Sequence, residues 1–506
     1  ARIAIVGPTG AGKEDLTLVL AGLLSPDRGR VSIGEHDIST LAESIAGRRM
    51  TYVGYPAQIF AGTIAHNLFF GLKHRPLTAI TPEDDDRKSH ERALMEARRS
   101  GNSSYDIDAD WVDYQAAGID DPRDLVPAAE RVLAMVRLDR DVYQMGLRGT
   151  IDPEDQPEVA DAVMKARRAM GERLQDPRLG RLVEVFDPDA YNTNATLAEN
   201  LLFGAPIGDE FTIDHLASQA YVQEVMRASG LTETLVEVGH RLASIMVELF
   251  ADLPPDHDYF RQFSFIDAED LPDYRALIGR IDASRLDDLG KAERQRLLAL
   301  TFKLIPARHR LGLVEEALQA RIVDARRHFR ENLPAALAAS VAFFDPDRYT
   351  AGASLQDNIL FGKIAYGQAQ AAERIGDLIG QVLADLDLRG QVIDVGLQAE
   401  VGVAGSRLSL PQRQKLALAR ALLKRPEILI VHDPIGPLDP GEQTAILEAM
   451  LQEFEGRTLI WSLGRSELAA RFDHVLVMRQ GQIVEQGAYD ELNHDGSALR
   501  AMVAAE

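Results

Sequence analysis

A glycine-rich loop near the start of the chain constrains the fold more strongly than any other sequence feature. It follows a short apolar run at 3–6, typical of a buried parallel strand, and precedes an amphipathic stretch at 13–24 that is typical of a helix. In such a strand–loop–helix unit, glycines let successive backbone N–H groups surround phosphate oxygens, and a lysine adds a positive charge. The sequence therefore predicts a nucleotide phosphate site formed by Gly7, Pro8, Thr9, Gly10, Ala11, Gly12 and Lys13.

The residue after this lysine departs from the phosphate-binding pattern. A serine or threonine is expected there, because its hydroxyl holds Mg²⁺, whereas this chain has Glu14. A carboxylate is also a Mg²⁺ ligand, but it brings negative charge toward the phosphates. At about 5 Å and an effective dielectric constant of about 20, one such charge costs about 3 kcal/mol. We expect nucleotide binding to be about a hundredfold weaker for this reason, unless Glu14 turns away or takes the metal itself.

The bulk composition narrows the choice of partners. The chain has 506 residues and a formal net charge of −23, and an acidic surface repels nucleic acid backbones, so we expect no nucleic acid partner. The absence of cysteine excludes disulfides, thiolate zinc sites and thiol nucleophiles. No uninterrupted apolar run reaches the roughly 18 residues that a membrane helix needs. Because the chain opens directly on an apolar strand, we expect further residues before Ala1.

Apolar runs near the C-terminus predict the remainder of a parallel sheet. Continuous apolar or mixed runs at 428–431, 458–462 and 475–478 alternate with helical patterns. This alternation is typical of a doubly wound α/β sheet. The long intervening region is strongly helical in character and rich in charged residues, which we expect to form solvated faces.

A short segment recurs three times along the chain. The copies lie at 62–71, 195–204 and 353–362, and the last two follow Phe-Asp-Pro-Asp-x-Tyr at 186–191 and 344–349. Such a recurrence indicates internal duplication of one structural unit. We therefore expect the helical region to contain decayed duplicates of part of the surrounding domain. The alternative is an unrelated helical insertion.

The C-terminal third carries several short motifs in a fixed order. Leu408-Ser409-Leu410-Pro411-Gln412 is followed by a helical stretch, an apolar strand at 426–431, Pro437-Leu438-Asp439 and a hairpin at 481–487. In order and spacing these resemble the signature, Walker B strand, D-loop and closing hairpin of the ATP-binding cassettes of ABC transporters. The stretch at 289–300 also resembles the signature helix, and the segment at 62–67 resembles that of exporter-type cassettes.

The resemblance implies an α/β fold, that of a P-loop NTPase of the ABC cassette type with an enlarged, mainly α-helical insertion. The expected parts are an N-terminal cassette segment at 1–71, the insertion at 72–340 and a C-terminal cassette segment at 341–506. The implied cofactor is ATP, with Mg²⁺ only if altered ligands hold it. The implied partners are a second cassette, in a homo- or heterodimer, and a transmembrane domain upstream or in a partner chain. The implied location is the cytoplasmic face of the membrane.

Most positions that carry the chemistry of this family are altered here. The Walker B aspartate is replaced by His432, and the following glutamate by Asp433, which is the candidate catalytic residue. The position of the switch histidine holds Gly464, and that of the Q-loop glutamine holds Tyr55, with Gln58 nearby. The sequence thus predicts ATP binding with weak or absent hydrolysis.

The signature has lost both of its glycines, which are replaced by Leu410 and Pro411. Its remaining family residues are Ser409 and Gln412, and the D-loop keeps Asp439. The resemblance implies that these residues face a nucleotide held by a partner cassette.

Two other functions remain open at this point. A soluble, non-catalytic scaffold would keep the cassette fold without its chemistry, and the enlarged insertion favours it. An active soluble ATPase is opposed by Glu14, His432 and Gly464.

Histidines and aspartates in the helical region do not have the spacing of metal ligands. We expect the histidines to be ordinary surface side chains and the aspartates to be polar loop residues, with no metal site among them. The residues concerned are His240, His257, His309, Asp256, Asp258, Asp267 and Asp270.

Overall fold

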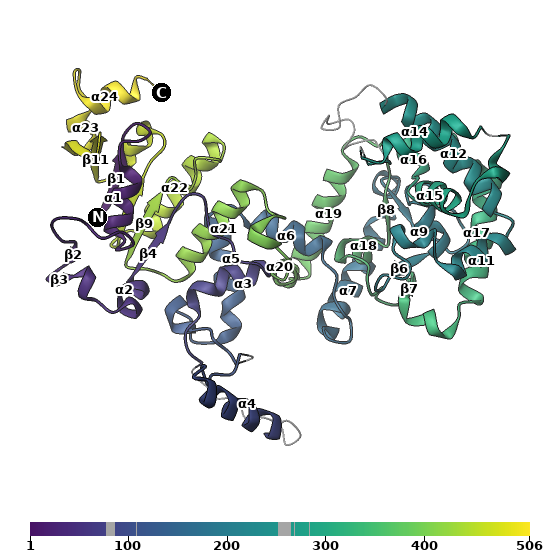
Figure 1. Ribbon diagram of the computed structural model, residues 1–506, viewed down its shortest axis with the longest axis horizontal. Helices are drawn as coiled ribbons and strands as arrows, with labels where there is room; N and C mark the ends of the chain where they lie inside the picture. Colours follow the sequence, from purple (N-terminus) through teal and green to yellow (C-terminus); the bar gives the residue numbers. More distant parts are fainter. Residues whose placement is uncertain (77–86, 108, 251–264, 268, 283, 506) are drawn as a thin grey trace. The chain divides into compact units, whose positions relative to one another are not determined.

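The computed structural model describes residues 1–506 except 77–86, 108, 251–264, 268, 283 and 506 (Figure 1). The chain divides into two compact units. Unit 1 comprises Ala1–Gly146 together with Ile393–Glu506, and unit 2 comprises Leu147–Val392. In the described part of the chain, no helix is both long and apolar enough to cross a bilayer.

A six-stranded sheet forms the centre of unit 1. Its order is β12–β11–β1–β10–β9–β4, with β12 antiparallel and the others parallel. The strands are β1 (Arg2–Val6), β4 (Met50–Val53), β9 (Ile428–His432), β10 (Thr458–Ser462), β11 (His474–Arg479) and β12 (Gln482–Gly487). Ile5, Val431 and Trp461 are fully buried, as residues of central parallel strands should be. The sheet confirms the expected α/β class.

Short elements surround this sheet in unit 1. Helix α1 packs against β9 and β10, and its side chains Leu16 and Leu20 pack against a buried cluster that includes Ile5 and Met478. The helix ends at Leu20, earlier than the apolar pattern suggests. The elements are α1 (Lys13–Leu20), β2 (Ser32–Ile33), β3 (His36–Asp37), α2 (Glu43–Arg49), α22 (Pro440–Glu453), α23 (Tyr489–Leu492) and α24 (Ala498–Val503).

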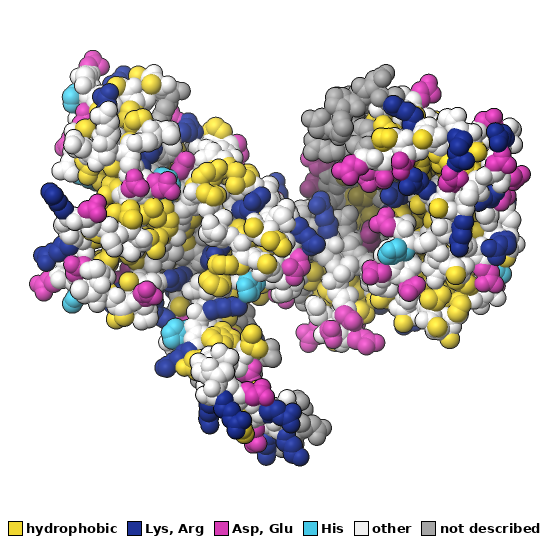
Figure 2. Space-filling model, in the orientation of Figure 1, with side chains coloured by type: hydrophobic (Ala, Val, Ile, Leu, Met, Phe, Trp, Pro, Cys, Tyr) yellow, Lys and Arg dark blue, Asp and Glu magenta, His cyan; other side chains and the backbone are white. Residues whose placement is uncertain are grey.

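A group of helices in unit 1 gathers around α21. Helix α21 packs against α3 and α5. Helix α4 differs from these because it buries none of its residues, and Figure 2 shows Lys and Arg side chains along it. The bounds are α3 (Ile64–Phe69), α4 (Arg87–Ser100), α5 (Leu125–Met135), α6 (Asp139–Arg148), α20 (Arg389–Leu397) and α21 (Leu410–Leu423).

Unit 2 is mainly helical, and a large apolar cluster forms the core of its part between Tyr191 and Val341. Its longer helices are α7 (Pro157–Arg173), α11 (Ala220–Ala228), α12 (Thr232–Phe250), α14 (Leu271–Arg280), α15 (Lys291–Phe302), α17 (Glu316–Glu331) and α19 (Ala371–Asp385). Its shorter helices are α8 (Pro177–Gly180), α9 (Leu197–Leu202), α10 (Ile213–Leu216), α16 (Pro306–His309) and α18 (Leu355–Leu360). Two antiparallel ladders pair β5 (Val183–Val185) with β8 (Gly362–Ile364), and β6 (Gly204–Pro206) with β7 (Val341–Phe343).

The three recurring segments have the same local structure. Each forms a one-to-two-turn helix, α3, α9 or α18, whose first turn is capped by a Thr or Ser side chain. Each buries one asparagine, Asn67, Asn200 or Asn358. The side-chain oxygens of these asparagines accept a hydrogen bond, at 2.8 Å in each case, from the N–H groups of Phe60, Asn192 and Thr350 respectively. The asparagine thus fixes the loop that leads into the helix.

Two buried arginines in unit 2 contact the copies at 195–204 and 353–362 and the stretches before them, and these are the first and second copies of this unit. Arg167 of α7 reaches the second copy, where it donates to the carbonyl oxygens of Asp345, Pro346, Arg348 and Asn358 and to Asn358 Oδ1. Arg326 of α17 reaches the first copy, where it donates to the carbonyl oxygens of Asp187, Pro188, Ala190 and Asn200 and to Asn200 Oδ1.

Aromatic rings and strands follow the same reciprocal arrangement. The rings of Phe186 and Phe344, the first residues of the two Phe-Asp-Pro-Asp stretches, stack at 4.0 Å between centroids. The strand before each copy pairs with the strand after the other. The copy at 353–362 thus packs with α7 inside unit 2, whereas the sequence analysis placed it in the C-terminal cassette segment at 341–506.

Candidate functional site

The glycine-rich loop lies between β1 and α1, as the strand–loop–helix pattern requires. Gly12, the residue before α1, has a φ of 86°, a left-handed conformation that favours glycine. The N–H of Ala11 donates to the carbonyl oxygen of Pro8 at 3.1 Å and closes the turn. The N–H groups of Gly10 and Gly12 donate to no acceptor among the described residues. These groups are thus available to a phosphate at the start of the helix.

The side chain of Lys13 is held at this loop by carbonyl groups from two elements. Its Nζ donates to the carbonyl oxygen of Gly7 at 2.7 Å and to that of Leu463, just after β10, at 3.0 Å. A lysine in this position presents a positive charge to a phosphate bound in the loop.

The end of β9 brings His432 and Asp433 toward the lysine. Strand β9 pairs in parallel with β10, so that His432 lies opposite Ser462, and the Asp433 N–H donates to the Ser462 carbonyl oxygen at 3.0 Å. Asp433 has a φ of 38°, which is unusual for a residue with a side chain. The altered Walker B positions therefore lie beside the loop.

Burial shifts the pKa of both side chains toward the neutral form. Burial raises the pKa of Asp433, while the charge of Lys13, the proximity of His432 and the Gly464 N–H oppose this rise. Burial lowers the pKa of His432, while the negative charges of Glu14 and Asp433 oppose the fall. The imidazole is thus held in its neutral form at neutral pH.

Gly464 is packed against the carboxylate of Asp433. A Cβ atom at Gly464 would lie 2.8 Å from Asp433 Oδ1, and one at Gly436 would lie 2.9 Å from Asp433 Oδ2. The carboxylate therefore fills the space beside the position where the family carries its switch histidine. The sequence shows both substitutions but not that they are coupled in space.

We expect Gly464→Ala to destabilise the fold by about 1–3 kcal/mol, because the added methyl group overpacks the Asp433 carboxylate. Urea denaturation monitored by tryptophan fluorescence, to which Trp461 on β10 and Trp111 contribute, measures this loss. The double variant Gly464→Ala/Asp433→Ala should recover most of the lost stability, because alanine in place of Asp433 leaves room for the added methyl group. Equal losses in the single and double variants would contradict the proposed contact.

The signature-like and D-loop residues make local contacts. Ser409 caps α21, and the side chains of Ser409 and Gln412 form a reciprocal capping box. Gln412 Nε2 also donates to Asp141 Oδ1 at 2.9 Å. Asp439 caps α22 by accepting from the N–H groups of Gly441 and Glu442. None of these described contacts joins the three residues to the phosphate loop.

The residues at the expected Mg²⁺ position do not fit that ion well. Mg²⁺ prefers an all-oxygen set of ligands in near-octahedral geometry. This chain places the carboxylate of Glu14 on the first turn of α1 and the imidazole of His432 at the end of β9. The imidazole brings a nitrogen donor to a position where the family has an oxygen. The described part of the chain holds no group of three or more potential metal ligands.

A pocket of about 390 Å³ opens beside Glu14, and its lining includes residues that the sequence pattern did not single out. Tyr52, Arg420 and Lys424 are these residues, and Tyr55, at the Q-loop position, lines the pocket with them. Burial raises the pKa of Tyr52 and lowers the pKa values of Arg420 and Lys424. Arg420 follows an alanine, as Arg167 and Arg326 do, but Ala-Arg pairs occur elsewhere in the chain and do not by themselves identify this residue.

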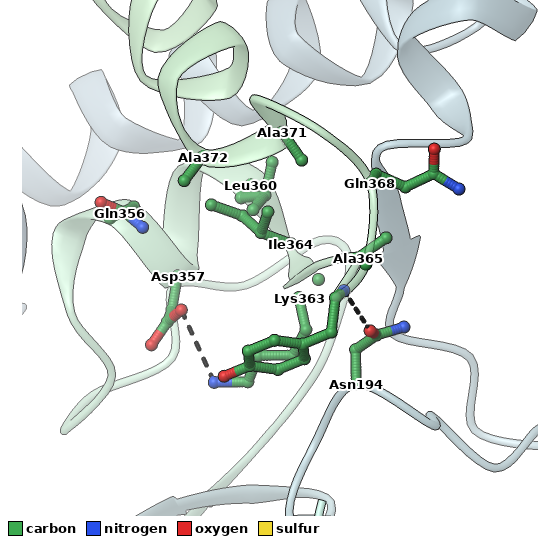
Figure 3. Close-up of a pocket in the computed structure, with 13 residues that line it drawn as sticks. Asn194, Gln356, Asp357, Leu360, Lys363, Ile364, Ala365, Gln368, Ala371 and Ala372 are labelled. Carbon is green, nitrogen blue, oxygen red and sulfur yellow. Dashed lines mark hydrogen bonds and ion pairs between the residues drawn. The ribbon is translucent and has the colours of Figure 1, made fainter. Parts of the chain in front are cut away.

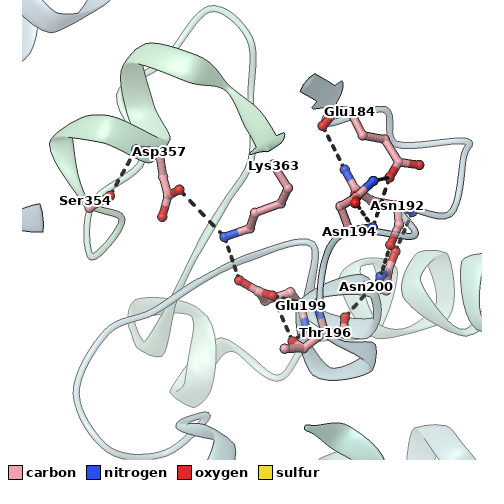
Figure 4. Close-up of polar contacts among 9 residues, drawn as sticks. All are labelled: Glu184, Asn192, Asn194, Thr196, Glu199, Asn200, Ser354, Asp357 and Lys363. Atoms are coloured by element: carbon pink, nitrogen blue, oxygen red, sulfur yellow. Dashed lines mark hydrogen bonds and ion pairs between the residues drawn. The ribbon is translucent and has the colours of Figure 1, made fainter. Parts of the chain in front are cut away.

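A second pocket, of about 410 Å³, lies in unit 2 (Figure 3). Its Lys363 donates to Glu199 at 2.9 Å and lies 3.7 Å from Asp357, and its Asn194 accepts from the Tyr366 N–H at 2.7 Å. Burial opposes the charge on Lys363, but the two carboxylates still raise its pKa. Figure 4 shows these groups within a continuous set of internal polar contacts. Because these polar groups are already engaged with one another, we assign no ligand to this pocket.

One histidine in the helical region differs from its expected surface position. His240 is 6% exposed and its Nε2 contacts the Ile281 carbonyl oxygen at 2.8 Å, so the surface prediction was wrong for this residue. His240 occupies a core position of α12 because its polar edge finds this backbone partner. The Ile305 N–H donates to Nδ1 of His309, and burial lowers the pKa of His309 to about 4. His257, Asp256 and Asp258 lie outside the described residues.

Comparison with known proteins supports the interpretation of this loop as a nucleotide-binding site. The model of the ABC transporter family matches residues 1–118. The heterocyst differentiation ATP-binding protein HepA of Nostoc sp. is 35% identical over 156 residues, 31% of this chain and 25% of HepA. An ATP-dependent lipid A-core flippase of Burkholderia orbicola is 32% identical over 227 residues, 41% of this chain and 37% of the flippase. The chain thus spans well under half the length of either relative.

A solved structure of a bacterial Atm1-family ABC exporter with ATP bound aligns with a TM-score of 0.36 and 12% identity, covering 100% of this chain and 37% of the exporter. The match at 1–118 and the named relatives, together with the strand–loop–helix site and the sheet that carries it, show that residues 1–118 form part of an ATP-binding cassette like those of ABC transporters.

Proposed function

We propose that this chain is the nucleotide-binding part of an ABC exporter-like transporter that holds ATP and hydrolyses it weakly or not at all. The observation that carries this proposal is a complete phosphate loop with Lys13 in place, beside altered residues at Glu14, His432 and Gly464. The family match supports ATP as the nucleotide. We assign phosphate binding to Gly7–Lys13.

Binding needs only groups that this loop supplies. The N–H groups of Gly10 and Gly12 are available to phosphate oxygens, and the N-terminus of α1 favours negative charge. Lys13 contributes a charge-assisted hydrogen bond to the β- and γ-phosphates. The carboxylate of Glu14 opposes this attraction, and weakens binding without abolishing it.

Hydrolysis needs groups that this site lacks or displaces. Phosphoryl transfer depends on positioning the attacking water and on neutralising phosphate charge, and a bound Mg²⁺ supplies that neutralisation. Asp433, the candidate base, is one methylene shorter than the glutamate of the family, and a displacement of about 1 Å lowers the rate by about a hundredfold. Its carboxylate also lies against Gly464, which offers no imidazole. All of these differences slow the same step, the transfer of the phosphoryl group to water.

The partners we propose follow from the family. A second cassette, in a homo- or heterodimer, would face Ser409, Gln412 and Asp439. A transmembrane domain, upstream or in a partner chain, would place this chain at the cytoplasmic face of the membrane. We also propose that the insertion at 72–340 includes decayed duplicates of the helical part of the cassette. The shared cap, buried asparagine and Ala-Arg pair support that origin.

Steady-state phosphate release measures the catalytic part of this proposal. We expect release by the unaltered chain with Mg²⁺ and ATP to remain near background, and Asp433→Asn to leave it unchanged. Asp433→Asn is nearly isosteric, so a folding defect should not obscure the comparison. Substantial Mg²⁺-dependent turnover that Asp433→Asn abolishes would contradict weak hydrolysis and identify Asp433 as a working base.

A further inference from the structure

This chain departs from the family pattern at two positions that are far apart in sequence, and at each the expected type of ligand is replaced by the other type. The position after the lysine has a carboxylate, Glu14, where the pattern has a neutral hydroxyl. The end of β9 has a neutral imidazole, His432, where the pattern has a carboxylate. The total charge of the two ligands is therefore conserved, although their positions are exchanged.

The fold brings these two residues to the same side of the phosphate loop. Helix α1 packs against β9, with Glu14 in the first turn of the helix and His432 as the last residue of the strand. The side chain of Glu14 is exposed and lines the adjoining pocket, and its charge acts on the His432 imidazole. His432 Nδ1 is buried and has no hydrogen-bond partner among the described residues. In the described part of the chain, no protein group therefore competes with a metal ion for this nitrogen atom.

We infer that Glu14 and His432 replace the Mg²⁺ ligands of the family with an oxygen–nitrogen pair, which selects a nitrogen-accepting divalent ion such as Mn²⁺ or Co²⁺ for the nucleotide. This inference rests on the proposed binding of ATP at the loop. Imidazole is a good ligand for first-row transition ions, whereas Mg²⁺ prefers oxygen and gives up its water reluctantly. The carboxylate of Glu14 supplies the negative charge that the family has at the end of this strand and that His432 does not carry.

Titration of a fluorescent ATP analogue with EDTA, Mg²⁺, Mn²⁺ or Co²⁺ measures this selectivity. We expect Co²⁺ to tighten binding by about tenfold more than Mg²⁺ does, and Mn²⁺ by a smaller factor, because affinity for nitrogen ligands rises from Mn²⁺ to Co²⁺. The exchange variant Glu14→Ser/His432→Asp restores the family pair, and it should remove this preference in favour of Mg²⁺. His494→Asp, on an exposed histidine remote in sequence from the loop, is the matched control and should leave the preference unchanged.

Pulsed electron paramagnetic resonance of Mn²⁺ with ATP gives a second readout, which is independent of affinity. We expect nitrogen modulation from a directly bound imidazole, lost in His432→Asp and kept in His494→Asp. Equal effects of Mg²⁺ and Mn²⁺, or nitrogen modulation that persists in His432→Asp, would overturn the inference while leaving the proposed ATP binding intact. Failure to bind the nucleotide with any ion or with EDTA would overturn both.

Discussion

Replacing Lys13 by alanine is expected to weaken ATP binding by about a hundredfold, because a charge-assisted hydrogen bond contributes roughly 1.5–3 kcal/mol. The lysine reaches the loop from the first turn of α1, and the carbonyl oxygens of Gly7 and Leu463 hold its Nζ there. Both carbonyls belong to buried residues, so an unfolding curve of the variant is recorded beside the titration to separate a loss of binding from a loss of fold. Isothermal titration with ATP in EDTA measures the effect without any contribution from a metal.

The control for this substitution is a lysine in the other unit. Lys303 is partly exposed and lies 3.7 Å from Asp214, and Lys303→Ala should bind ATP as the unaltered chain does. Equal affinities of Lys13→Ala and the unaltered chain would show that the phosphate loop does not carry nucleotide binding. A chain that binds no nucleotide would instead favour the scaffold alternative.

The largest effect on stability is expected from the buried arginines of unit 2. Arg326→Ala should lower the free energy of unfolding by about 3–5 kcal/mol, because buried carbonyl groups lose their donor. The Arg326 side chain donates to the carbonyl oxygens of Asp187, Pro188, Ala190 and Asn200, and its guanidinium lies 4.4 Å from the centre of the Phe203 ring. Arg167→Ala should have an effect of similar size, because Arg167 makes the matching contacts with the second copy.

Hydrogen exchange of the amides at 186–203 and 344–361 tests this account locally, which suits a chain of two units better than a single global transition. Arg326→Ala should increase exchange first at 186–203, and Arg167→Ala first at 344–361. Arg326→Lys should rescue little, because an ammonium group cannot match the planar fork of donors. Arg327→Ala is the control; it removes an exposed neighbour and should change stability by no more than about 0.5 kcal/mol. Arginine variants that behave like Arg327→Ala would contradict a structural role for the reciprocal contacts.

Much of the cassette core was predictable because its signals are local. The run at 458–462 coincides with β10, and the run at 428–431 lies within β9, because buried parallel strands require continuous apolar residues. The end of α1 was less predictable. The apolar pattern continues to Leu24, yet the helix ends at Leu20 and Leu23 is 63% exposed.

The pairing inside unit 2 could not be predicted from motif spacing. The signature-like stretch at 289–300 forms α15, which packs mainly on α12, whereas α9 is held by α17. The residue responsible is Arg326, whose partners lie more than a hundred positions away in the sequence. Only the Ala-Arg pair shared with α7 and α21 hints at this role, and two residues are too short a signal to detect beforehand.

Around the phosphate loop, the motifs identified the altered family positions but not how their side chains would pack. The spacing placed His432, Asp433 and Gly464 at strand ends, and the register of β9 and β10 brings them to one edge of the sheet. The contact between the Asp433 carboxylate and Gly464 depends on a φ of 38° at Asp433, which no residue pattern encodes.

The fate of bound nucleotide distinguishes a cassette that holds ATP from one that hydrolyses it. Radiolabelled ATP is mixed with an excess of the chain and a divalent cation, and the bound label is separated and identified over several hours. We expect binding of the label to depend on Lys13, and the bound label to be recovered as ATP. Label recovered as ADP, formed by the unaltered chain and not by Asp433→Asn, would contradict it.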